Sequence, residues 1–291
     1  MLRVRPLLLT FRAIDELRFP EGPASNTLRG ALGLLGGAGL WPARRSPERG
    51  NWPSPSGLAD APPPFVLRSS HLDQQSFAPN SEFHFHLHLF ETRDESLALI
   101  QAAFSRLYQE GLGPGRARVE LLSIANTTPI EISLAPPPGP IPQLTVHFQT
   151  PTELKSRAAI AQRPDFPILA ARLRDRIATL SDLYGTASLD LDFRAFATRA
   201  AGIRMTHCDI HHESAHRRST RTGQTHPLGG FVGQASYEGD LREFLPWLEA
   251  AHWTGVGRQT AWGKGQLRTQ RFGDAPHRAG QDCPQLDGRA H

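Results

Sequence analysis

A proline-rich run at residues 135–142, Ala-Pro-Pro-Pro-Gly-Pro-Ile-Pro, most constrains how this chain can fold. Proline lacks a backbone N–H and fixes φ at about −65°, so neither a helix nor a central strand can pass through the run. Such segments form extended spacers instead. The chain has 291 residues, 39% of them apolar, which is enough for a separate core on each side. We therefore expect two domains, at residues 1–135 and 141–273.

The same order of helices and strands is expected on both sides of this run. In the first half, apolar spacing predicts strands at 2–13, 65–69, 82–90 and 116–125, with helices from 24 or 25 to 36 and from 94 or 95 to 110. Ser25 or Asn26 could cap the first helix. In the second half, strands are expected at 144–150, 202–212, 229–238 and 266–272, with helices at 166–184 and from 239–241 to 253. This order predicts an α+β protein with two tandem ferredoxin-like (RRM-like, βαββαβ) domains.

Three segments fall outside this pattern. Residues 37–64 are rich in proline and glycine and predict a long surface insertion, while the polar residues 274–291 predict a flexible tail. The first residues are too few and too interrupted by arginine for a signal peptide or a membrane span. We therefore expect a cytoplasmic protein without membrane contact. Cys208 and Cys283 are too few for a disulfide framework and lack zinc-finger spacing.

A glycine-rich loop lies near the C-terminus, with the spacing G-x-G-x5-G-x-G at Gly255, Gly257, Gly263 and Gly265. Glycine permits positive φ and leaves main-chain N–H groups open to a ligand, so the loop suits an anion. Arg258 and Lys264 lie within it. A helix is expected before the loop and a strand after it, which reverses the order of a P-loop or a dinucleotide-binding turn. We therefore expect no nucleotide cofactor, and no other cofactor is expected.

Two further segments accompany the loop, Pro-Leu-Gly-Gly-Phe-Val-Gly at 227–233 and Leu-Arg-Gly-Ala-Leu-Gly at 28–33. Together, and mainly over residues 217–270, they resemble the CRISPR repeat-processing endoribonucleases of the RAMP superfamily. The resemblance implies that the loop closes the last helix of a second ferredoxin-like domain and lies against RNA. It implies CRISPR repeat RNA as the partner, and a CRISPR effector complex as a further partner. Whether the protein is a monomer or a homodimer stays open.

The basic residues suit such a ligand. The chain has two lysines, Lys155 and Lys264, so 30 of its 32 basic residues are arginine, whose guanidinium group favours bidentate phosphate contacts. A GC-rich genome would produce the same bias, so it supports RNA binding only where arginines cluster. The expected RNA-binding residues are Arg29, Arg217, Arg218, Arg221, Gly255, Gly257, Arg258, Gly263, Lys264 and Gly265.

Residues 204–221 form the strongest such cluster, with four histidines and four arginines. As a hairpin ahead of the Gly-Gly-Phe-Val-Gly strand, this segment would contact RNA phosphates through Arg217, Arg218 and Arg221. Two alternatives stay open. One is a solvated hairpin without a special role, and the other is a zinc site, since two histidine pairs are four residues apart. That spacing suits a helix rather than a strand, so no metal is expected.

A second group of histidines lies on the strand expected at 82–90. His84, His86 and His88 alternate with apolar residues and therefore share one face of the strand. They could bind a metal or line a nucleic-acid face. A solvated sheet face is the alternative interpretation.

RNA cleavage of the kind that the resemblance implies needs no metal. The ribose 2′-hydroxyl attacks the neighbouring phosphate and leaves a 2′,3′-cyclic phosphate, so the protein supplies a base, an acid and positive charge. Histidine suits the first two roles because its pKa lies near neutrality. Many members of the family place a catalytic histidine near the first helix, often with a tyrosine and a lysine, but residues 1–70 contain none of these three types.

We therefore expect the catalytic base among His211, His212 and His216, which adjoin the arginines of the same cluster. The histidines of the 82–90 strand are a second source, and arginines that only orient the RNA are a third. Two alternative functions follow. One is a catalytically silent RAMP subunit that binds RNA in an effector complex, and the other is a metal-dependent enzyme built on the thirteen histidines.

Overall fold

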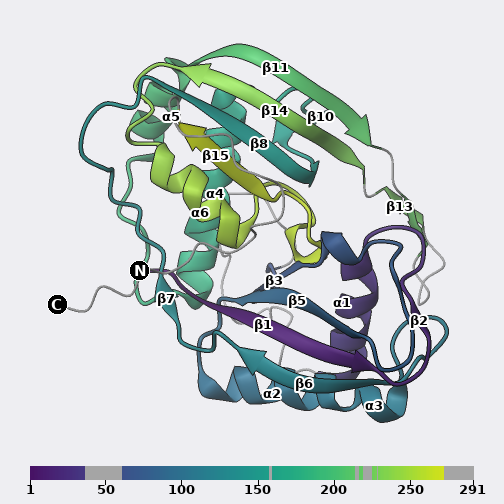
Figure 1. Cartoon of the computed structure of the whole chain (residues 1–291). Helices are drawn as coiled ribbons and strands as arrows, with labels where there is room; N and C mark the ends of the chain where they lie inside the picture. The colour runs from purple at the N-terminus through teal and green to yellow at the C-terminus, as the bar shows by residue number, and fades with distance from the viewer. Residues whose placement is uncertain (37–60, 157–158, 214–215, 219–224, 228, 272–291) are drawn as a thin grey trace.

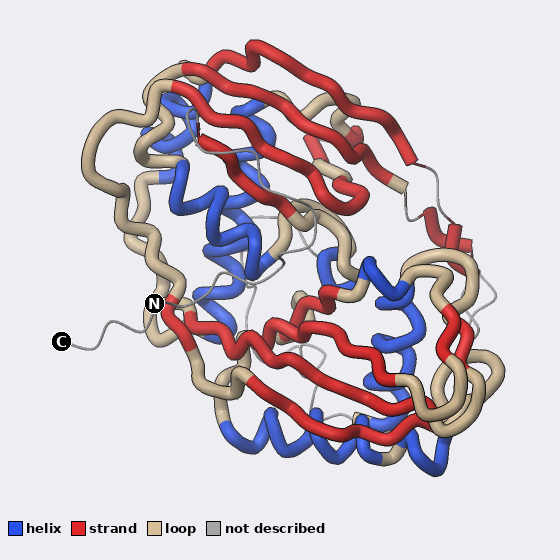
Figure 2. The backbone as a smooth tube through the Cα atoms, in the orientation of Figure 1, coloured by secondary structure: helices blue, strands red, loops and turns tan. Residues whose placement is uncertain are grey.

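The computed structural model describes residues 1–36, 61–156, 159–213, 216–218, 225–227 and 229–271, with only the backbone at 216–218 and 225–227. Within these ranges the chain forms two lobes, each with one main antiparallel sheet and helices packed against it (Figures 1 and 2). Of the insertion predicted at 37–64, residues 37–60 lie outside the described residues, and only 61–64 are described. The tail predicted at 274–291 lies outside the described residues.

The first lobe is built on four strands in the spatial order β3-β5-β1-β6, namely β1 (Arg3–Ala13), β3 (Phe65–Arg68), β5 (Glu82–Leu89) and β6 (Val119–Ala125). Each strand runs antiparallel to its neighbours, and the short β7 (Ile130–Glu131) pairs with the start of β1. The helices are α1 (Ala24–Leu35), α2 (Asp94–Ser105) and α3 (Leu107–Glu110), and the short strands β2 (Leu17–Arg18) and β4 (Ser76–Phe77) pair beside them.

Strand β5 shows why one face of this sheet is covered by helices. Its side chains alternate between the two faces, so Phe83, Phe85 and Leu87 point to the same side and are buried there. Phe11 of β1 stacks on Phe85 with ring centroids 5.7 Å apart, and Phe104 of α2 meets both rings edge-on at 5.6 Å. These aromatic contacts hold α2 against the sheet.

The second lobe has the same strand order. Its sheet is ordered β11-β14-β8-β15 and consists of β8 (Gln143–Thr152), β11 (Arg204–Glu213), β14 (Gly230–Glu238) and β15 (Leu267–Arg271). Numbered along the chain, the main strands of both sheets therefore lie in the order second, third, first, fourth. The proline run falls within residues 132–142, which contain no helix or strand and connect the two sheets.

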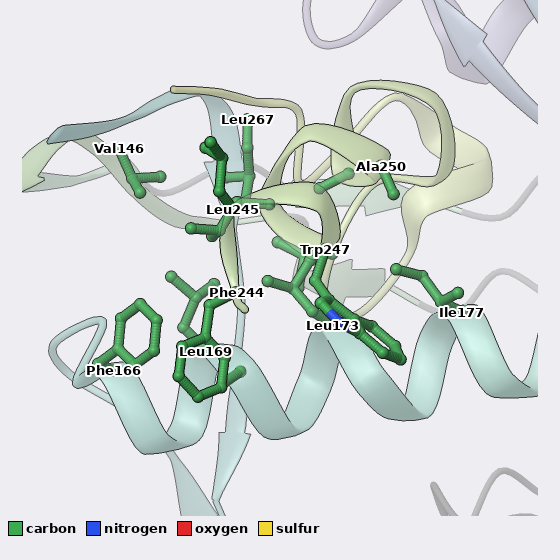
Figure 3. Close-up of a cluster of buried hydrophobic side chains, with 14 of the residues drawn as sticks. Val146, Phe166, Leu169, Leu173, Ile177, Phe244, Leu245, Trp247, Ala250 and Leu267 are labelled. Carbon is green, nitrogen blue, oxygen red and sulfur yellow. The ribbon is translucent and has the colours of Figure 1, made fainter. Parts of the chain in front are cut away.

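Helices α4 (Phe166–Tyr184) and α6 (Leu245–Thr254) cover one face of the second sheet, and α5 (Phe193–Ala201) packs on α4 (Figure 3). Leu169, Leu173 and Ile177 recur every four residues along α4, so they form one buried stripe that meets Phe244 and Leu245. Full burial of a side chain of this size stabilises the fold by about 1.5–3 kcal/mol. The apolar stripe therefore accounts for the position of α6 above the sheet.

The two lobes share buried contacts. Leu2, which directly precedes β1, Val4 of β1 and Val66 of β3 belong to the same buried cluster as the core of the second lobe. Strand β1 begins between the lobes, so its first residues are buried by the second lobe and its later ones by the first (Figure 1). The lobes are therefore joined by a continuous interior as well as by the proline-rich connection.

Two arginines, one from each lobe, meet at the C-terminal end of α6, which belongs to the second lobe. Arg68 of β3 donates from Nη2 to His252 O at 2.8 Å, and Arg176 of α4 donates from Nε to Thr254 O at 3.2 Å. Both side chains are buried, and the last carbonyl groups of a helix carry partial negative charge that favours cations. Burial, together with the neighbouring Arg176, lowers the pKa of Arg68 to about 9.

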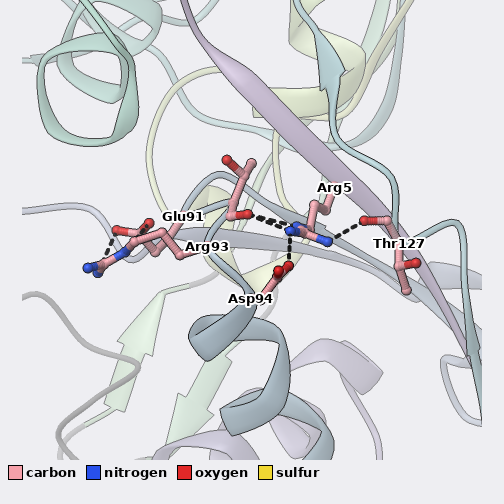
Figure 4. Close-up of polar contacts among 6 residues, drawn as sticks. Arg5, Glu91, Arg93, Asp94 and Thr127 are labelled. Carbon is pink, nitrogen blue, oxygen red and sulfur yellow. Dashed lines mark hydrogen bonds and ion pairs between the residues drawn. The ribbon is translucent and has the colours of Figure 1, made fainter.

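Arg5 performs a similar role inside the first lobe (Figure 4). It donates to Thr92 O, to Thr127 O at 2.6 Å and to the Asp94 carboxylate at 2.5 Å. Its side chain is only 10% exposed, so these bonds replace most of its hydration. Asp94 opens α2, where negative charge is favourable. Arg5 thereby fixes the start of α2 relative to β1.

The expected elements are largely confirmed, with shifted ends. The helix expected to run without interruption to residue 110 is interrupted at Arg106, between α2 and α3, and the strand expected from residue 116 begins at Val119. Helix α5 was not expected. Its signal in the sequence is Asp192, whose side chain accepts from the backbone N–H groups of Arg194 and Ala195 as an N-cap does.

The cap predicted for α1 is wrong. Neither Ser25 nor Asn26 caps the helix, because the helix already begins at Ala24. The N–H of Ala24 donates to Asp73 Oδ1 at 2.7 Å, and Asp73 lies 49 residues further along the chain. This cap comes from a distant loop, so no local pattern could have shown it.

Candidate functional site

The glycine-rich loop lies between the two lobes, where the short helical turn η3 (Thr260–Trp262) touches α1 and β3 (Figure 1). All four of its glycines have positive φ, from 66° to 81°. Residues with a side chain rarely adopt this conformation, so the expectation that the glycines serve the backbone geometry is confirmed.

The space beside these glycines is filled by the chain itself. A Cβ atom on Gly265 would lie 1.9 Å from Val256 O, and one on Gly257 would lie 2.4 Å from Glu153 O. Several loop N–H groups are also used internally, since Val256 N donates to Gly265 O and Arg258 N donates to Glu153 O. The expectation that the loop holds its main-chain N–H groups open for a ligand is therefore wrong at these positions.

Lys264 is buried inside this arrangement, at 2% exposure. Its Nζ donates to Gly229 O at 2.6 Å and to Gln259 Oε1 at 2.9 Å, and it lies 3.5 Å from the Glu153 carboxylate. Burial lowers the pKa of Lys264, whereas Glu153 raises it. Arg258 forms an ion pair with the other oxygen of Glu153. These bonds tie the loop to the end of β8 and to the residue before β14.

The loop also contacts helix α1 of the first lobe. Ser25 Oγ donates to Trp262 O at 2.5 Å, and the guanidinium carbon of Arg29 lies 5.0 Å from the centre of the Trp262 ring. Gly263 is close to Leu67 O, and its carbonyl accepts from Thr150 Oγ1 at 2.9 Å. Arg29 therefore lies at the junction of both lobes, against an aromatic ring of the glycine-rich loop.

A cleft of about 330 Å³ opens at this junction. Its walls come from both lobes, with the start of α1 and the 69–74 segment on one side and β8, β11, β14 and the loop on the other. The lining residues are Gly22, Pro23, Ser25, Ser69, Ser70, Asp73, Gln74, Gln149, Thr150, Pro151, Glu213, Val232, Trp262, Gly263, Lys264 and Gln266. We call this space the interdomain cleft.

Asp73 is the half-buried carboxylate of the interdomain cleft. Burial raises its pKa, the hydrogen bond from Ala24 N opposes that shift, and Glu213 of the opposite lobe adds to it. A carboxylate with a raised pKa in a cleft is typical of a functional site. Asp73 was not among the residues predicted from the sequence. Its signal was the polar stretch Ser-Ser-His-Leu-Asp-Gln-Gln-Ser that directly follows the buried strand β3.

The predicted catalytic histidines lie at the end of β11. His211 and His212 are exposed, with His211 Nε2 3.7 Å from Glu213 Oε1 and His212 Nε2 3.2 Å from Gln162 O. Glu213, the next residue, lines the interdomain cleft. The structure therefore brings His211 and His212 to the rim of the cleft rather than into its lining.

The hairpin β12 (His216–Arg218) and β13 (Thr225–Pro227) continues from β11 and β14 towards the first lobe (Figure 1). The expected hairpin is thus confirmed for the backbone. The side chains of His216, Arg217 and Arg218 lie outside the described structure, as does the whole of Arg221. Their expected contacts with RNA stay predictions.

The three histidines of β5 have different surroundings. His84 is exposed and His86 is half-buried, which agrees with a solvated face, but that interpretation is wrong for His88. His88 is 3% exposed, and its Nδ1 lies 3.0 Å from Trp253 O, so the ring donates to this carbonyl. Burial, together with Arg68 and His252, lowers the pKa of His88 well below 6.5. His88 therefore belongs to the junction of the lobes.

None of the described residues form a group of three or more His, Cys, Asp or Glu side chains placed to hold a metal ion. In the same part of the chain, no helix has the length and apolar character to cross a membrane.

The second lobe is similar to a known protein family. Residues 146–267 match the family model of the CRISPR-associated endoribonuclease Cas6, and residues 44–136 match a model described as an N-terminal domain. No curated protein sequence matches the chain. The matched residues 146–267 include the end of β11, β14 and the glycine-rich loop.

Solved Cas6 structures share the fold. A Cas6 product complex aligns with a TM-score of 0.56 at 17% identity, over 93% of this chain and 100% of that chain. Thermus thermophilus Cas6 aligns with a TM-score of 0.52 at 15% identity, over 93% of this chain and 99% of that chain. A chain of a partial Cas6-RT-Cas1–Cas2 complex aligns with a TM-score of 0.57 at 12% identity, over 95% of this chain and 47% of that chain. The second lobe thus matches the family model of Cas6, and the chain shares the fold of solved Cas6 structures along nine-tenths of its length.

Proposed function

We propose that this chain is an endoribonuclease that binds CRISPR precursor RNA and cleaves it within the repeats, giving guide RNAs. The observation that carries the proposal is the Cas6 family match over residues 146–267, which contain the glycine-rich loop closing the interdomain cleft. The identical strand order of the two sheets supports a classification of the fold as two tandem ferredoxin-like domains. The proposed partner is repeat RNA, with a CRISPR effector complex as a second one.

The proposed reaction is attack of the ribose 2′-hydroxyl on the adjacent phosphate, without a metal, leaving a 2′,3′-cyclic phosphate. Oxygen bonds to phosphorus, the 5′-oxygen of the next nucleotide leaves, and one proton is removed while another is delivered. His211, His212 and His216 are the proposed acid and base groups. The first two lie beside the cleft-lining Glu213, so a phosphate at the rim would be within reach of the β11 end.

The proposed RNA contacts divide into two groups. Arg217 and Arg218 lie on β12, which extends towards the first lobe, and Arg221 follows them in the sequence; guanidinium groups suit phosphate oxygens. Arg29 and the glycine-rich loop lie at the junction of the lobes, and Arg258 and Lys264 are already paired with Glu153. We infer that this second group acts on RNA by shaping the cleft, with Lys264 holding the loop in place from inside.

A second candidate function is a catalytically silent RNA-binding subunit. The specific observation that favours it is the lining of the interdomain cleft, whose described residues include no histidine. Under this proposal the repeat is bound with the same residues, but no proton transfer takes place and the RNA leaves intact.

The separating experiment incubates purified protein with the repeat RNA of the CRISPR array nearest to its gene, in the presence of EDTA. Cleavage at one position, with a 2′,3′-cyclic phosphate identified by mass spectrometry, is expected. The cleavage rates of the variants His211→Gln, His212→Gln and His216→Gln are then compared. The variant that lacks the proton-transferring histidine should show the largest loss of rate. Tight binding without cleavage would favour the silent subunit, and cleavage that requires added metal would contradict the mechanism.

A further inference from the structure

The interdomain cleft has a lining that suits a more specific ligand than an RNA backbone. We propose that it holds one unstacked nucleobase of the repeat, with Trp262 as its stacking partner and Asp73 as the acceptor of hydrogen bonds from its Watson–Crick edge. The base that this chemistry favours is guanine. This inference rests on the proposed function, since it takes RNA as the ligand.

The charges of the cleft disfavour a phosphate group at its centre. Among the lining residues that the structure describes, only Asp73, Glu213 and Lys264 carry charge, and Lys264 is already paired with Glu153 at 3.5 Å. Two carboxylates from opposite lobes are left to set the local charge. Phosphate oxygens are negative and only accept hydrogen bonds, whereas the edges of nucleobases are uncharged and offer N–H donors. A base is therefore the better match.

Asp73 is held in a fixed position for this contact. Its Oδ1 accepts from Ala24 N at 2.7 Å, which places the carboxylate at the N-terminal end of α1. An ionised carboxylate has about four acceptor positions on its two oxygens, so this single bond leaves most of them for a ligand. Guanine presents N1–H and its 2-amino group side by side, which match two carboxylate oxygens. The Watson–Crick edges of adenine, cytosine and uracil each place a single donor group beside acceptors.

Trp262 supplies the apolar surface that a base needs. Trp262 is a half-buried lining residue of the cleft, and the guanidinium carbon of Arg29 lies 5.0 Å from the centre of its ring. Ser25 Oγ donates to the Trp262 carbonyl, which fixes the backbone of the same residue. Single-stranded RNA is commonly bound by stacking unpaired bases on aromatic side chains. An aromatic ring beside a carboxylate is the combination that such a pocket requires.

A buried hydroxyl in the same lining points to a ligand independently. Ser69 is 2% exposed, and within the described structure its Oγ has no hydrogen-bond partner. Buried polar groups are bonded in the large majority of cases, so a ligand atom at this position would complete its bonding. The volume of about 330 Å³ lies at the small end of the range for ligand pockets, which suits one nucleotide rather than a duplex.

The test uses the full-length protein and the repeat RNA of the nearest CRISPR array, with each guanine replaced in turn by inosine, which lacks the 2-amino group. Inosine at one position should weaken binding roughly 5- to 100-fold, the range for a specific bidentate base contact, and inosine elsewhere should leave it unchanged. Asp73→Asn should cause a loss of the same size with unmodified RNA and no further loss with that inosine RNA. If Asp73→Asn and the inosine replacement each weakened binding independently, so that their fold-losses multiplied, the proposal would be overturned.

Three more variants test the stacking contact and control for unfolding. Trp262→Leu should weaken binding roughly 5- to 100-fold, as expected for removing one base-stacking contact, while Trp262→Phe should retain most of it. Asp190→Asn is the matched control, because Asp190 is exposed and does not line the cleft. Thermal unfolding of each variant shows whether it is folded. Full binding by folded Trp262→Leu would overturn the stacking contact.

The outcomes separate this inference from the proposed function. Wild-type protein that cleaves the repeat but tolerates inosine at every guanine keeps the proposed function and overturns the base pocket. Asp73→Asn that binds normally but no longer cleaves would assign Asp73 to proton transfer and also overturn it. Wild-type protein that does not bind the repeat overturns both.

Discussion

The glycine-rich loop and the end of β11 with its hairpin are both polar, and both were predicted to touch RNA, but the structure gives them different surroundings. In the loop, Lys264 is buried and bonded to Glu153 and Gly229. At the end of β11, His211 and His212 are exposed at the rim of the interdomain cleft. Polar residues in the first region hold the site together, while those in the second are available to a ligand.

The difference shows what glycine spacing does and does not reveal. Spacing correctly indicated positive φ at Gly255, Gly257, Gly263 and Gly265. It could not show whether the space beside each glycine belongs to a ligand or to the chain. In this loop, Val256 O and Glu153 O occupy that space at Gly265 and Gly257. A loop typical of anion binding can thus be closed upon itself.

The largest expected effect tests the buried ion pair of the loop. Lys264→Met leaves the Glu153 carboxylate without this partner and should lower the free energy of unfolding by about 3–5 kcal/mol, as for breaking other buried pairs. Lys155→Met is the control, because Lys155 is exposed on β9 (Lys155–Ser156) and should change stability by less than about 0.5 kcal/mol. Urea unfolding measures both. Equal effects would mean that the loop is not held by Lys264.

A glycine pair tests the backbone of the loop. Gly265→Ala should destabilise the fold by about 1–3 kcal/mol from its φ of 71° alone, and further through contact with Val256 O. Gly30→Ala is the matched control, because Gly30 lies within α1 with open space beside it. Alanine there should stabilise the helix by about 0.5–1 kcal/mol. A neutral Gly265→Ala would show that the loop can rearrange.

The buried His88 gives the junction of the lobes a pH dependence. Its pKa in the folded protein lies below the ordinary 6.5, so the unfolded chain binds a proton first as the pH falls. The stability that the neutral, buried His88 contributes is therefore fully present above about pH 6.5 and is lost as the pH falls below that value. When the pH is lowered from 7.5 to 5.5, the free energy of unfolding of the wild type should fall by on the order of 1 kcal/mol more than that of His88→Gln.

The control for this experiment is His207→Gln, since His207 is exposed on β11. That variant should follow the wild-type pH dependence. A His88→Gln variant with the wild-type slope would show that the ring is hydrated or protonated in the folded protein, contrary to its burial beside Arg68 and His252.

The smallest expected effect tests the exposed region. Arg218→Ala should weaken repeat binding and lower the slope of log affinity against log salt by roughly 0.7, the value for one phosphate contact to single-stranded RNA. Arg93→Ala is the control, since Arg93 pairs with Glu91 beside the start of α2 and lies outside the cleft lining. An unchanged slope in Arg218→Ala would remove this residue from the phosphate contacts.

Local patterns were sufficient for most of the fold. Alternation along β5 and the stripe Leu169, Leu173 and Ile177 on α4 are properties of neighbouring residues, so the sequence shows them directly. The candidate cleft depends on contacts between distant segments. Asp73 caps α1 across 49 residues, and Trp262 meets Arg29 from the far end of the chain. Such pairs appear only once both lobes are assembled.

The shared end of α6 has a consequence for how RNA enters the cleft. Arg68 from one lobe and Arg176 from the other both donate to the last carbonyl groups of this helix, and the loop begins at the next residue. The bond from Arg176 lies within the second lobe, whereas the bond from Arg68 crosses between the lobes, so opening the lobes would separate the buried Arg68 from its acceptor at a cost of about 1–3 kcal/mol. This contact opposes widening of the gap between the lobes, so under the proposed function a repeat RNA would enter by bending, unpairing or turning out a base.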